Sequence, residues 1–162
     1  MDARSRNDWP LLGLLIAIVI GVNLLVGALI APSADWVSQL TMPPVLLPQG
    51  LSAVVQLILS IAFAIVGWRI WLLSPRLGLD MGLWAASLAL GWLFTPAFLM
   101  IRAVAGAMTI IVLMVLILGF LNLRLWRSDR IAAYLLAPST LWVVYTAVLT
   151  GWVIGINRFP VA

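Results

Sequence analysis

The fold of this chain is decided by the stretch AVAGAMTIIVLMVLILGFLNLRL, residues 103–125, which carries a single charged residue near its end. A helix needs about 20 apolar residues to cross the hydrocarbon core of a bilayer, so this run is long enough to span a membrane. Four further runs have the same character, at residues 9–30, 51–73, 81–101 and 131–156. The sequence therefore predicts an all-α integral membrane protein, with residues 1–162 forming one domain of five transmembrane helices.

The composition of the whole chain supports this prediction. Of its 162 residues, 65% are hydrophobic and 9% are charged, whereas soluble domains are about half apolar and about a quarter charged. A water-soluble protein with so few charges would have little polar surface to present to solvent. The composition therefore indicates a polytopic membrane protein in contact with the lipid bilayer.

The ionisable side chains limit the chemistry that the chain can perform. There are nine arginines and five aspartates, with no lysine, glutamate, histidine or cysteine, and every aspartate lies outside the apolar runs. The expected spans therefore hold no proton carrier, no thiol nucleophile and no set of metal ligands. A haem iron would find no histidine or cysteine ligand, and proton-coupled transporters usually have an ionisable residue within the membrane. These absences favour a binding protein with no catalytic residue, no metal site and no obligatory cofactor.

The arginines also predict how the helices are oriented. One side of the expected bundle holds Arg102 and Arg158, and the other side holds Arg4, Arg6, Arg69, Arg76, Arg124, Arg127 and Arg130. Because arginine accumulates in cytoplasmic loops, we expect a cytoplasmic N-terminus and an external C-terminus. The net charge of +4 is then explained by topology and anionic headgroups rather than by nucleic acid. We expect a bacterial inner membrane, because outer-membrane spans are usually barrels.

The connection between the first two spans, residues 31–50, is the only long one. It contains Trp36 and several other apolar side chains, and regular structure in it is disfavoured by Pro43, Pro44 and Pro48. An apolar loop of this kind is poorly solvated by water. We expect a lid that folds over the helix ends, with a segment lying among the lipid headgroups as the alternative.

The stretch GWLFTPAFLM, residues 91–100, combines three aromatic rings with a proline inside a span. Pro96 cannot donate a hydrogen bond to the carbonyl of Trp92, so we expect the helix to open locally there. Such a bend would turn rings of this stretch toward a cavity, where Trp142 and Trp36 would close it.

Polar and aromatic side chains in three spans indicate a ligand pocket. Ser52, Gln56 and Ser60 lie four residues apart and share one face of the second span. Hydroxyl groups alone would be explained by hydrogen bonds between helices, but large rings inside a bundle suit a flat or long apolar ligand. The predicted ligand-binding residues are Trp36, Pro43, Gln56, Ser87, Trp92, Phe94, Thr95, Phe98, Trp142, Tyr145 and Thr146.

These features together resemble the tryptophan-rich sensory protein / translocator protein (TspO/MBR) family. The resemblance rests on five spans, many tryptophans, a proline-rich lid, the pattern LxxPxF in the third span and APSxLWxxYxxxL…N in the last. It is strongest over residues 85–157. The matching positions are Trp36, Leu40, Pro43, Pro48, Pro96, Phe98, Pro138, Trp142 and Asn157.

The resemblance implies a five-helix bundle, often dimeric, with a pocket under the lid. Family members bind porphyrins, sterols and other apolar ligands, and in bacteria they are tied to tetrapyrrole and stress regulation. This chain departs from the family by having smaller or less polar residues at Leu51, Val55, Ser87, Gly91, Phe94, Ser139 and Thr150. A roomier and more apolar pocket follows, which weakens the implied porphyrin binding and fits a longer, less polar ligand such as a carotenoid or another polyisoprenoid. The same departures equally fit a pocket that has been lost, with the bundle kept as a partner protein for another membrane complex.

Three functions are consistent with this sequence. The first is non-catalytic binding of a hydrophobic, pigment-like molecule, either a tetrapyrrole or a carotenoid or other isoprenoid, for sensing, regulation or delivery. The second is an accessory or assembly subunit of a larger membrane complex, such as a photosynthetic one. In that case small-residue faces such as Gly151 and Gly155 would dock a partner or a second copy, although they equally suit packing within the bundle. The third, a porphyrin-degrading enzyme, is disfavoured by the missing acid–base groups.

Overall fold

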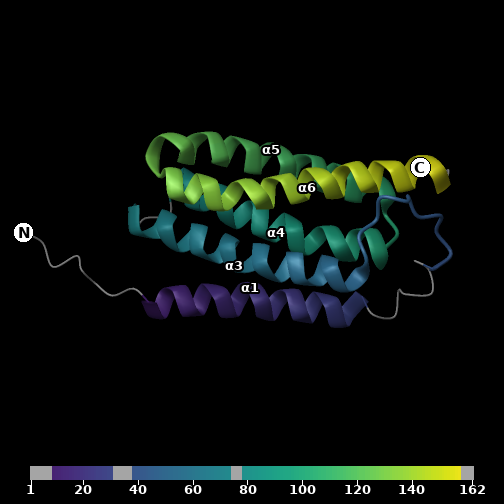
Figure 1. The fold of residues 1–162 in the computed structure, drawn as a ribbon, viewed down its shortest axis with the longest axis horizontal. Coiled ribbons are helices and arrows are strands. Elements are labelled where there is room, and N and C mark those ends of the chain that lie inside the picture. Colours follow the sequence, from purple (N-terminus) through teal and green to yellow (C-terminus); the bar gives the residue numbers. More distant parts are fainter. Residues whose placement is uncertain (1–8, 31–37, 74–77, 158–162) are drawn as a thin grey trace, which may run out of the picture.

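The computed structural model describes residues 9–30, 38–73 and 78–157. Within these residues the chain forms helices and the loops that connect them, and it has no strand. All five long helices are apolar and long enough to cross a membrane, and they run side by side as an elongated bundle (Figure 1). The predicted fold class is therefore confirmed. The helices are α1 (Trp9–Ile30), α3 (Gln49–Leu73), α4 (Leu79–Leu99), α5 (Val104–Ser128) and α6 (Arg130–Asn157).

The observed helices begin and end within a few residues of the five predicted spans. Pro48 precedes α3 and accepts a hydrogen bond from the N–H of Ser52 at 3.0 Å. The connection from α5 to α6 is Asp129 alone, which accepts hydrogen bonds from the N–H groups of Ile131 and Ala132 at 3.0 and 3.2 Å. Asp129 thereby caps the start of α6. Such short connections make neighbouring helices antiparallel.

The described part of the lid, residues 38–48, lies at one end of the bundle, here called the lid end, and the connection between α5 and α6 lies at the other, the charged end (Figure 1). Most charged residues of the described chain belong to segments at the charged end. At the charged end, Arg69 forms a bidentate ion pair with Asp129, with N···O distances of 2.7 and 3.0 Å. Arg124 on α5 pairs with Asp80 on α4. The Arg69 guanidinium holds the pKa of the Asp129 carboxyl below its usual value. These two ion pairs link α3 to the α5–α6 connection and α4 to α5 at the charged end.

The half of the bundle next to the charged end is closely packed. Its core includes fully buried side chains on α5 and α6, which are Leu118, Leu121, Leu125, Ala132, Ala133 and Leu136, and Val66 of α3 is fully buried too. Between α3 and α4, the Trp84 indole stacks on Phe63 with ring centroids 5.5 Å apart and donates a hydrogen bond to the Phe63 carbonyl at 2.9 Å. Gly67 makes room for this ring, because a Cβ there would lie 2.5 Å from it. Any larger residue at position 67 would displace Trp84.

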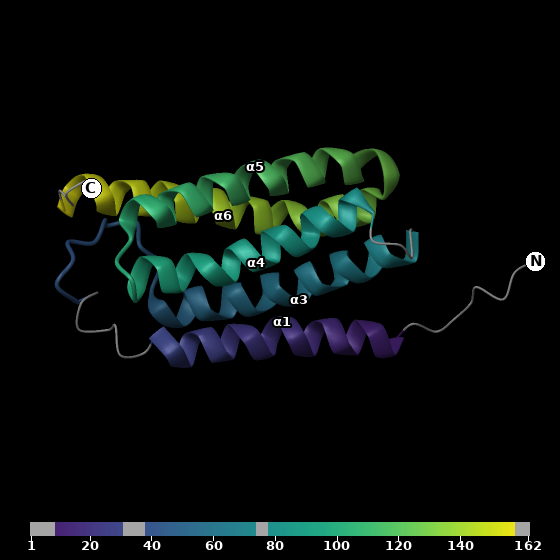
Figure 2. The ribbon, with the colours of Figure 1, turned by 180° about the vertical axis from the view of Figure 1, so that it is seen from behind.

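Helix α1 occupies an edge of the bundle, beside α3, in both views (Figures 1 and 2). Val19 is its one buried residue. Trp9 at its start stacks on Trp68 of α3, with ring centroids 5.4 Å apart. The rest of α1 exposes large apolar side chains such as Leu24, which is 70% exposed, as expected for a helix that faces lipid.

Candidate ligand-binding site

A cavity of about 550 Å³ lies inside the half of the bundle next to the lid end. All five helices contribute to its wall: residues 19–30 of α1, 52–63 of α3, 87–95 of α4, 111–118 of α5 and 139–146 of α6 supply lining side chains. Most of these side chains are apolar. The cavity therefore lies within the apolar layer of the bundle, between the packed core and the lid end.

The cavity exists because several inward positions carry small residues. Ser87, Gly91 and Thr95 are four residues apart on α4, so they lie on one helical face, and all three line the cavity. On α5, Met114 approaches this face, and a Cβ at Gly91 would lie 3.2 Å from its Cε. Small side chains on this face leave space that a leucine or phenylalanine would fill.

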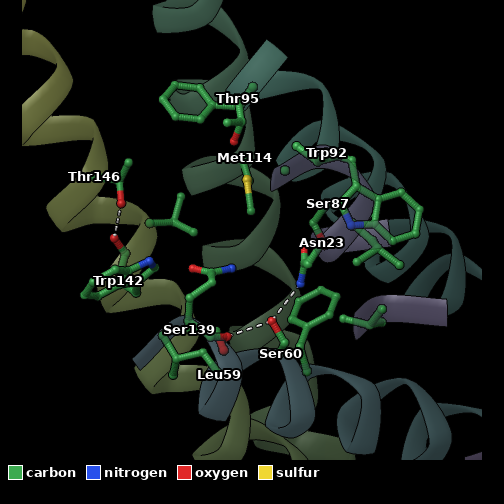
Figure 3. Close-up of a pocket in the computed structure, with 18 of the residues that line it drawn as sticks. Asn23, Leu59, Ser60, Ser87, Trp92, Thr95, Met114, Ser139, Trp142 and Thr146 are labelled. Carbon is green, nitrogen blue, oxygen red and sulfur yellow. Dashed lines mark hydrogen bonds between the residues drawn. The ribbon is translucent and has the colours of Figure 1, made fainter. Parts of the chain in front are cut away.

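Most of the predicted site residues line this cavity (Figure 3). They come from α3, α4 and α6, three of the five helices, and are Gln56, Ser87, Trp92, Phe94, Thr95, Trp142 and Thr146. Trp36, also predicted, falls outside the described residues. Whether these side chains bind a ligand stays a prediction.

Three predicted residues lie beside the cavity rather than on its wall. Phe98 stacks on Phe94, with ring centroids 6.1 Å apart and an interplanar angle of 8°. Pro43 is buried within the lid, where its carbonyl accepts a hydrogen bond from the N–H of Leu46 at 3.2 Å. Tyr145 packs against Trp142, with ring centroids 5.3 Å apart. Phe98 and Tyr145 therefore support side chains that do line the cavity, while Pro43 shapes the lid.

The described part of the lid is fastened to α6 at two points. The Tyr145 hydroxyl donates a hydrogen bond to the Val45 carbonyl at 3.0 Å and accepts one from the N–H of Leu47 at 3.4 Å. Asn157 binds both backbone groups of Thr41, accepting from its N–H at 2.9 Å and donating to its carbonyl at 3.0 Å. The residues 38–48 thus fold back onto the bundle, which agrees with the lid rather than with a segment lying free among headgroups.

The effect of Pro96 differs from the expected mid-span opening. Helix α4 continues through Pro96 and ends three residues later, at Leu99, and the N–H of Met100 still donates to the Pro96 carbonyl at 2.9 Å. Because Pro96 sits in the last turn, the missing hydrogen bond affects the end of the helix rather than its middle. Trp92 lines the cavity through its position on the helix, about two turns before this end.

Asn23 was not predicted as a site residue, although it is the only amide side chain in the first span. Its Nδ2 donates to the Ser60 hydroxyl at 2.9 Å, and that hydroxyl donates to the Gln56 carbonyl at 2.7 Å (Figure 3). This polar chain joins α1 to α3 on the cavity wall. A lone amide within an apolar run signals such a contact, because an unpaired amide in lipid is costly.

Hydroxyl groups on α6 mostly bond to their own helix rather than across the bundle. Thr140, Thr146 and Thr150 donate to the carbonyls four residues earlier, at 3.1, 2.9 and 2.8 Å. Two buried polar atoms on the cavity wall differ, since Ser139 Oγ and Trp92 Nε1 have no hydrogen-bond partner. A buried polar group without a partner costs about 1–3 kcal/mol. Both atoms are covered by protein atoms rather than open to the cavity.

The described wall of the cavity carries no charged side chain. Among the described residues there is also no group of three histidine, cysteine, aspartate or glutamate side chains that could hold a metal ion. What the wall offers is apolar surface, aromatic rings, two amide side chains and a few hydroxyl and indole groups. Such a wall can bind and orient an apolar molecule.

Comparison with known proteins gives an independent assignment. The TspO/MBR family profile matches residues 14–154. The chain is also similar to Protein CrtK from Rhodobacter capsulatus, with 28% identity over 126 residues, which covers 76% of this chain and 78% of that protein. Since the family match covers most of the chain, this protein belongs to the TspO/MBR family.

Proposed function

We propose that this protein binds a hydrophobic, pigment-like small molecule in the cavity, for sensing, regulation or delivery, without converting it. The observation that carries the proposal is a partly open pocket of about 550 Å³ lined by all five helices. Ligand pockets usually measure about 300–1,000 Å³ and combine apolar walls with a few placed polar groups. A tetrapyrrole, a carotenoid or another isoprenoid has the flat or long apolar body that this wall suits.

Binding without catalysis is favoured by the side chains that the chain has. General acid–base catalysis needs a proton carrier within hydrogen-bond reach of the reacting group, and the cavity wall offers only hydroxyl, amide and indole groups among the described residues. The chain contains no histidine, cysteine, lysine or glutamate at all. Porphyrin degradation would therefore have to proceed without the usual proton carriers.

We further propose that the charged end faces the cytoplasm of a bacterial cell and that the cavity lies in the outer half of the inner membrane. The proposal is supported by the arginines, most of which belong to the N-terminus and to the two connections at the charged end. In this orientation a ligand can reach the cavity by two routes, from the external leaflet or past the lid.

The test begins with the full chain extracted gently from its native membrane. Its visible absorption spectrum is recorded beside a gel of the proteins that accompany it. Bands of a bound tetrapyrrole or carotenoid that travel with the single chain are the expected result. A complex of several chains with no pigment on this one would instead support the accessory-subunit alternative and contradict the proposal.

A cavity-filling variant then locates the binding site. Gly91→Leu adds atoms where Met114 leaves little room, so we expect saturable quenching of tryptophan fluorescence by added ligand to weaken at least about tenfold. The matched control is Gly13→Leu, at an exposed position with open space around its Cβ, which should bind like the wild type. Equal weakening by both variants, or no quenching of the wild type, would show that the cavity is not a binding site.

A further inference from the structure

We propose that the cavity selects a ligand that carries a hydroxyl group on an apolar body, and that the side-chain amide of Gln56 binds this hydroxyl. The inference rests on the proposed function and deepens it. It names the ligand class as a hydroxylated isoprenoid, in preference to the hydrocarbon of the same length.

The first observation is the direction in which Gln56 points from α3. Ser52 and Ser60, four residues to either side on the same helical face, line the cavity as Gln56 does. Val54 and Ile58, two residues to either side, lie on the opposite face of the helix, because a helix turns by about 100° per residue. These two side chains are 55% and 60% exposed, as expected for a surface that faces lipid. Gln56 is exposed as well, and since it lies on the inward face, the space that exposes it is the cavity.

The second observation is that the Gln56 amide forms no hydrogen bond with the described residues. Its main-chain carbonyl accepts a hydrogen bond from the Ser60 hydroxyl at 2.7 Å, which leaves the side chain unused. Most hydroxyl groups of the cavity wall differ, because each already donates to a main-chain carbonyl. This is the case for Ser52, Ser60, Ser87 and Thr146. An amide in an apolar space is costly until it finds a partner, so Gln56 favours a ligand with a polar group.

The third observation is a second amide beside Gln56, that of Asn23 on α1. The Ser60 hydroxyl connects the two residues, since it accepts from Asn23 Nδ2 at 2.9 Å and donates to the Gln56 carbonyl (Figure 3). The Asn23 side chain lines the cavity, and its Oδ1 can accept a further hydrogen bond. Two neighbouring amides therefore offer donors and acceptors together. A ligand hydroxyl, which both donates and accepts, matches this pair better than a carbonyl, which only accepts.

The test compares β-cryptoxanthin with β-carotene, which share a polyene and differ by one hydroxyl group. Dissociation constants are measured by tryptophan quenching of the full chain in nanodiscs of zwitterionic lipid. We expect β-cryptoxanthin to bind about fivefold more tightly, which is the usual net effect of one hydrogen bond. Equal affinities for the two carotenoids would overturn the selection of a hydroxyl group.

The role of Gln56 is tested with Gln56→Met, which keeps the length of the side chain and removes its amide. Gln39→Met is the matched control, because it makes the same change at an exposed position of the lid, outside the cavity wall. Gln56→Met should bind the two carotenoids equally, whereas Gln39→Met keeps the fivefold preference. Comparing the proteins also cancels any difference in how the two carotenoids partition into lipid. A preference that survives in Gln56→Met would overturn the role of this amide.

Thermal stability distinguishes a ligand-binding amide from a structural one. Without ligand, Gln56→Met should melt at the temperature of the wild type or slightly above it, because it removes an amide that no described residue binds. A melting temperature lowered by several degrees would show that Gln56 holds the helices together, and it would contradict the proposal.

The results with the wild type separate this inference from the proposed function. If both carotenoids bind and the hydroxyl group gives no advantage, the selection of a hydroxyl is wrong although the cavity still binds pigments. If neither carotenoid nor protoporphyrin IX quenches the wild type, the proposed function itself fails. This comparison needs no variant, so it decides the question of the hydroxyl group even if a substitution prevents folding.

Discussion

The two halves of the bundle are built from the same five helices, yet one is filled and the other is hollow. Near the charged end, leucines of α5 pack against alanines of α6, and Trp84 fills the space beside Gly67. Near the lid end, α4 presents Ser87, Gly91 and Thr95 inward, and a cavity of about 550 Å³ remains. The difference shows that the packed half holds the helices together, so that the other half can keep an open space.

The largest expected effect comes from removing side-chain atoms in the packed half. Leu121 is fully buried, and Leu121→Ala should lower the free energy of unfolding in detergent by about 2–5 kcal/mol, because it creates a new void. Leu59→Ala removes the same atoms from the cavity wall and should cost clearly less, since it enlarges a space that already exists. Equal losses of thermal stability in the two variants would contradict the division into a filled and a hollow half.

A second comparison uses the two tryptophans of α4. Trp84→Phe removes a satisfied hydrogen bond and leaves a void beside Gly67, so we expect it to cost about 1–3 kcal/mol. Trp92→Phe removes an unpaired N–H and should leave the stability of the ligand-free protein unchanged or slightly higher. Melting temperatures of both variants without ligand provide the measurement. A larger loss for Trp92→Phe would mean that this indole is needed for packing.

The ion pair at the charged end should contribute less, and its contribution should depend on pH. Asp129 bonds Arg69 and caps α6, so Asp129→Asn should cost about 1–2 kcal/mol at neutral pH. The pKa of Asp129 in the folded protein lies below its usual value, which is about 3.9 in an unfolded chain. The stabilisation is therefore fully present above about pH 4 and is lost as the pH falls through the lower, folded pKa.

Unfolding curves between pH 7 and pH 2 check this prediction. The difference in stability between the wild type and Asp129→Asn should be constant at neutral pH and shrink in acid. Asp80→Asn is the matched control, because it breaks the more exposed pair with Arg124, and its effect should be smaller at every pH. A difference that grows as the pH falls would show that Asp129 is not stabilised as a carboxylate.

In both halves of the bundle the helices were predictable from the sequence, but the contacts between the helices were not. The five spans follow from apolar runs of sufficient length, because lipid leaves the backbone few alternatives to a helix. The face formed by Ser52, Gln56 and Ser60 could be read from its spacing. The partner of Ser60, however, is Asn23 on α1, and no periodicity within one helix reveals which other helix lies beside it.

The roles of individual rings were harder to predict for the same reason. Trp84 and Trp92 are both tryptophans of one span, but one is packed and hydrogen-bonded while the other lines the cavity. What separates them is Gly67, which belongs to α3 and makes room for Trp84 alone. Tyr145 was predicted as a ligand-binding residue, and its contact with the lid through its hydroxyl was not predicted. Such roles depend on contacts between segments far apart in the sequence.

The smallest expected effect concerns the closure of the hollow half. Tyr145→Phe keeps the ring against Trp142 but removes the hydroxyl that bonds Val45 and Leu47. Because the lid loses these two hydrogen bonds, it should open more often, and a bound ligand should dissociate a few times faster. Thermal stability should fall by about 1 kcal/mol or less. Stopped-flow release of a quenching ligand measures the rate, with Tyr134→Phe, an exposed tyrosine near the charged end, as the control. Release rates that do not change in Tyr145→Phe would mean that ligands leave between the helices into the bilayer, and the lid would then be a fixed cover rather than a gate.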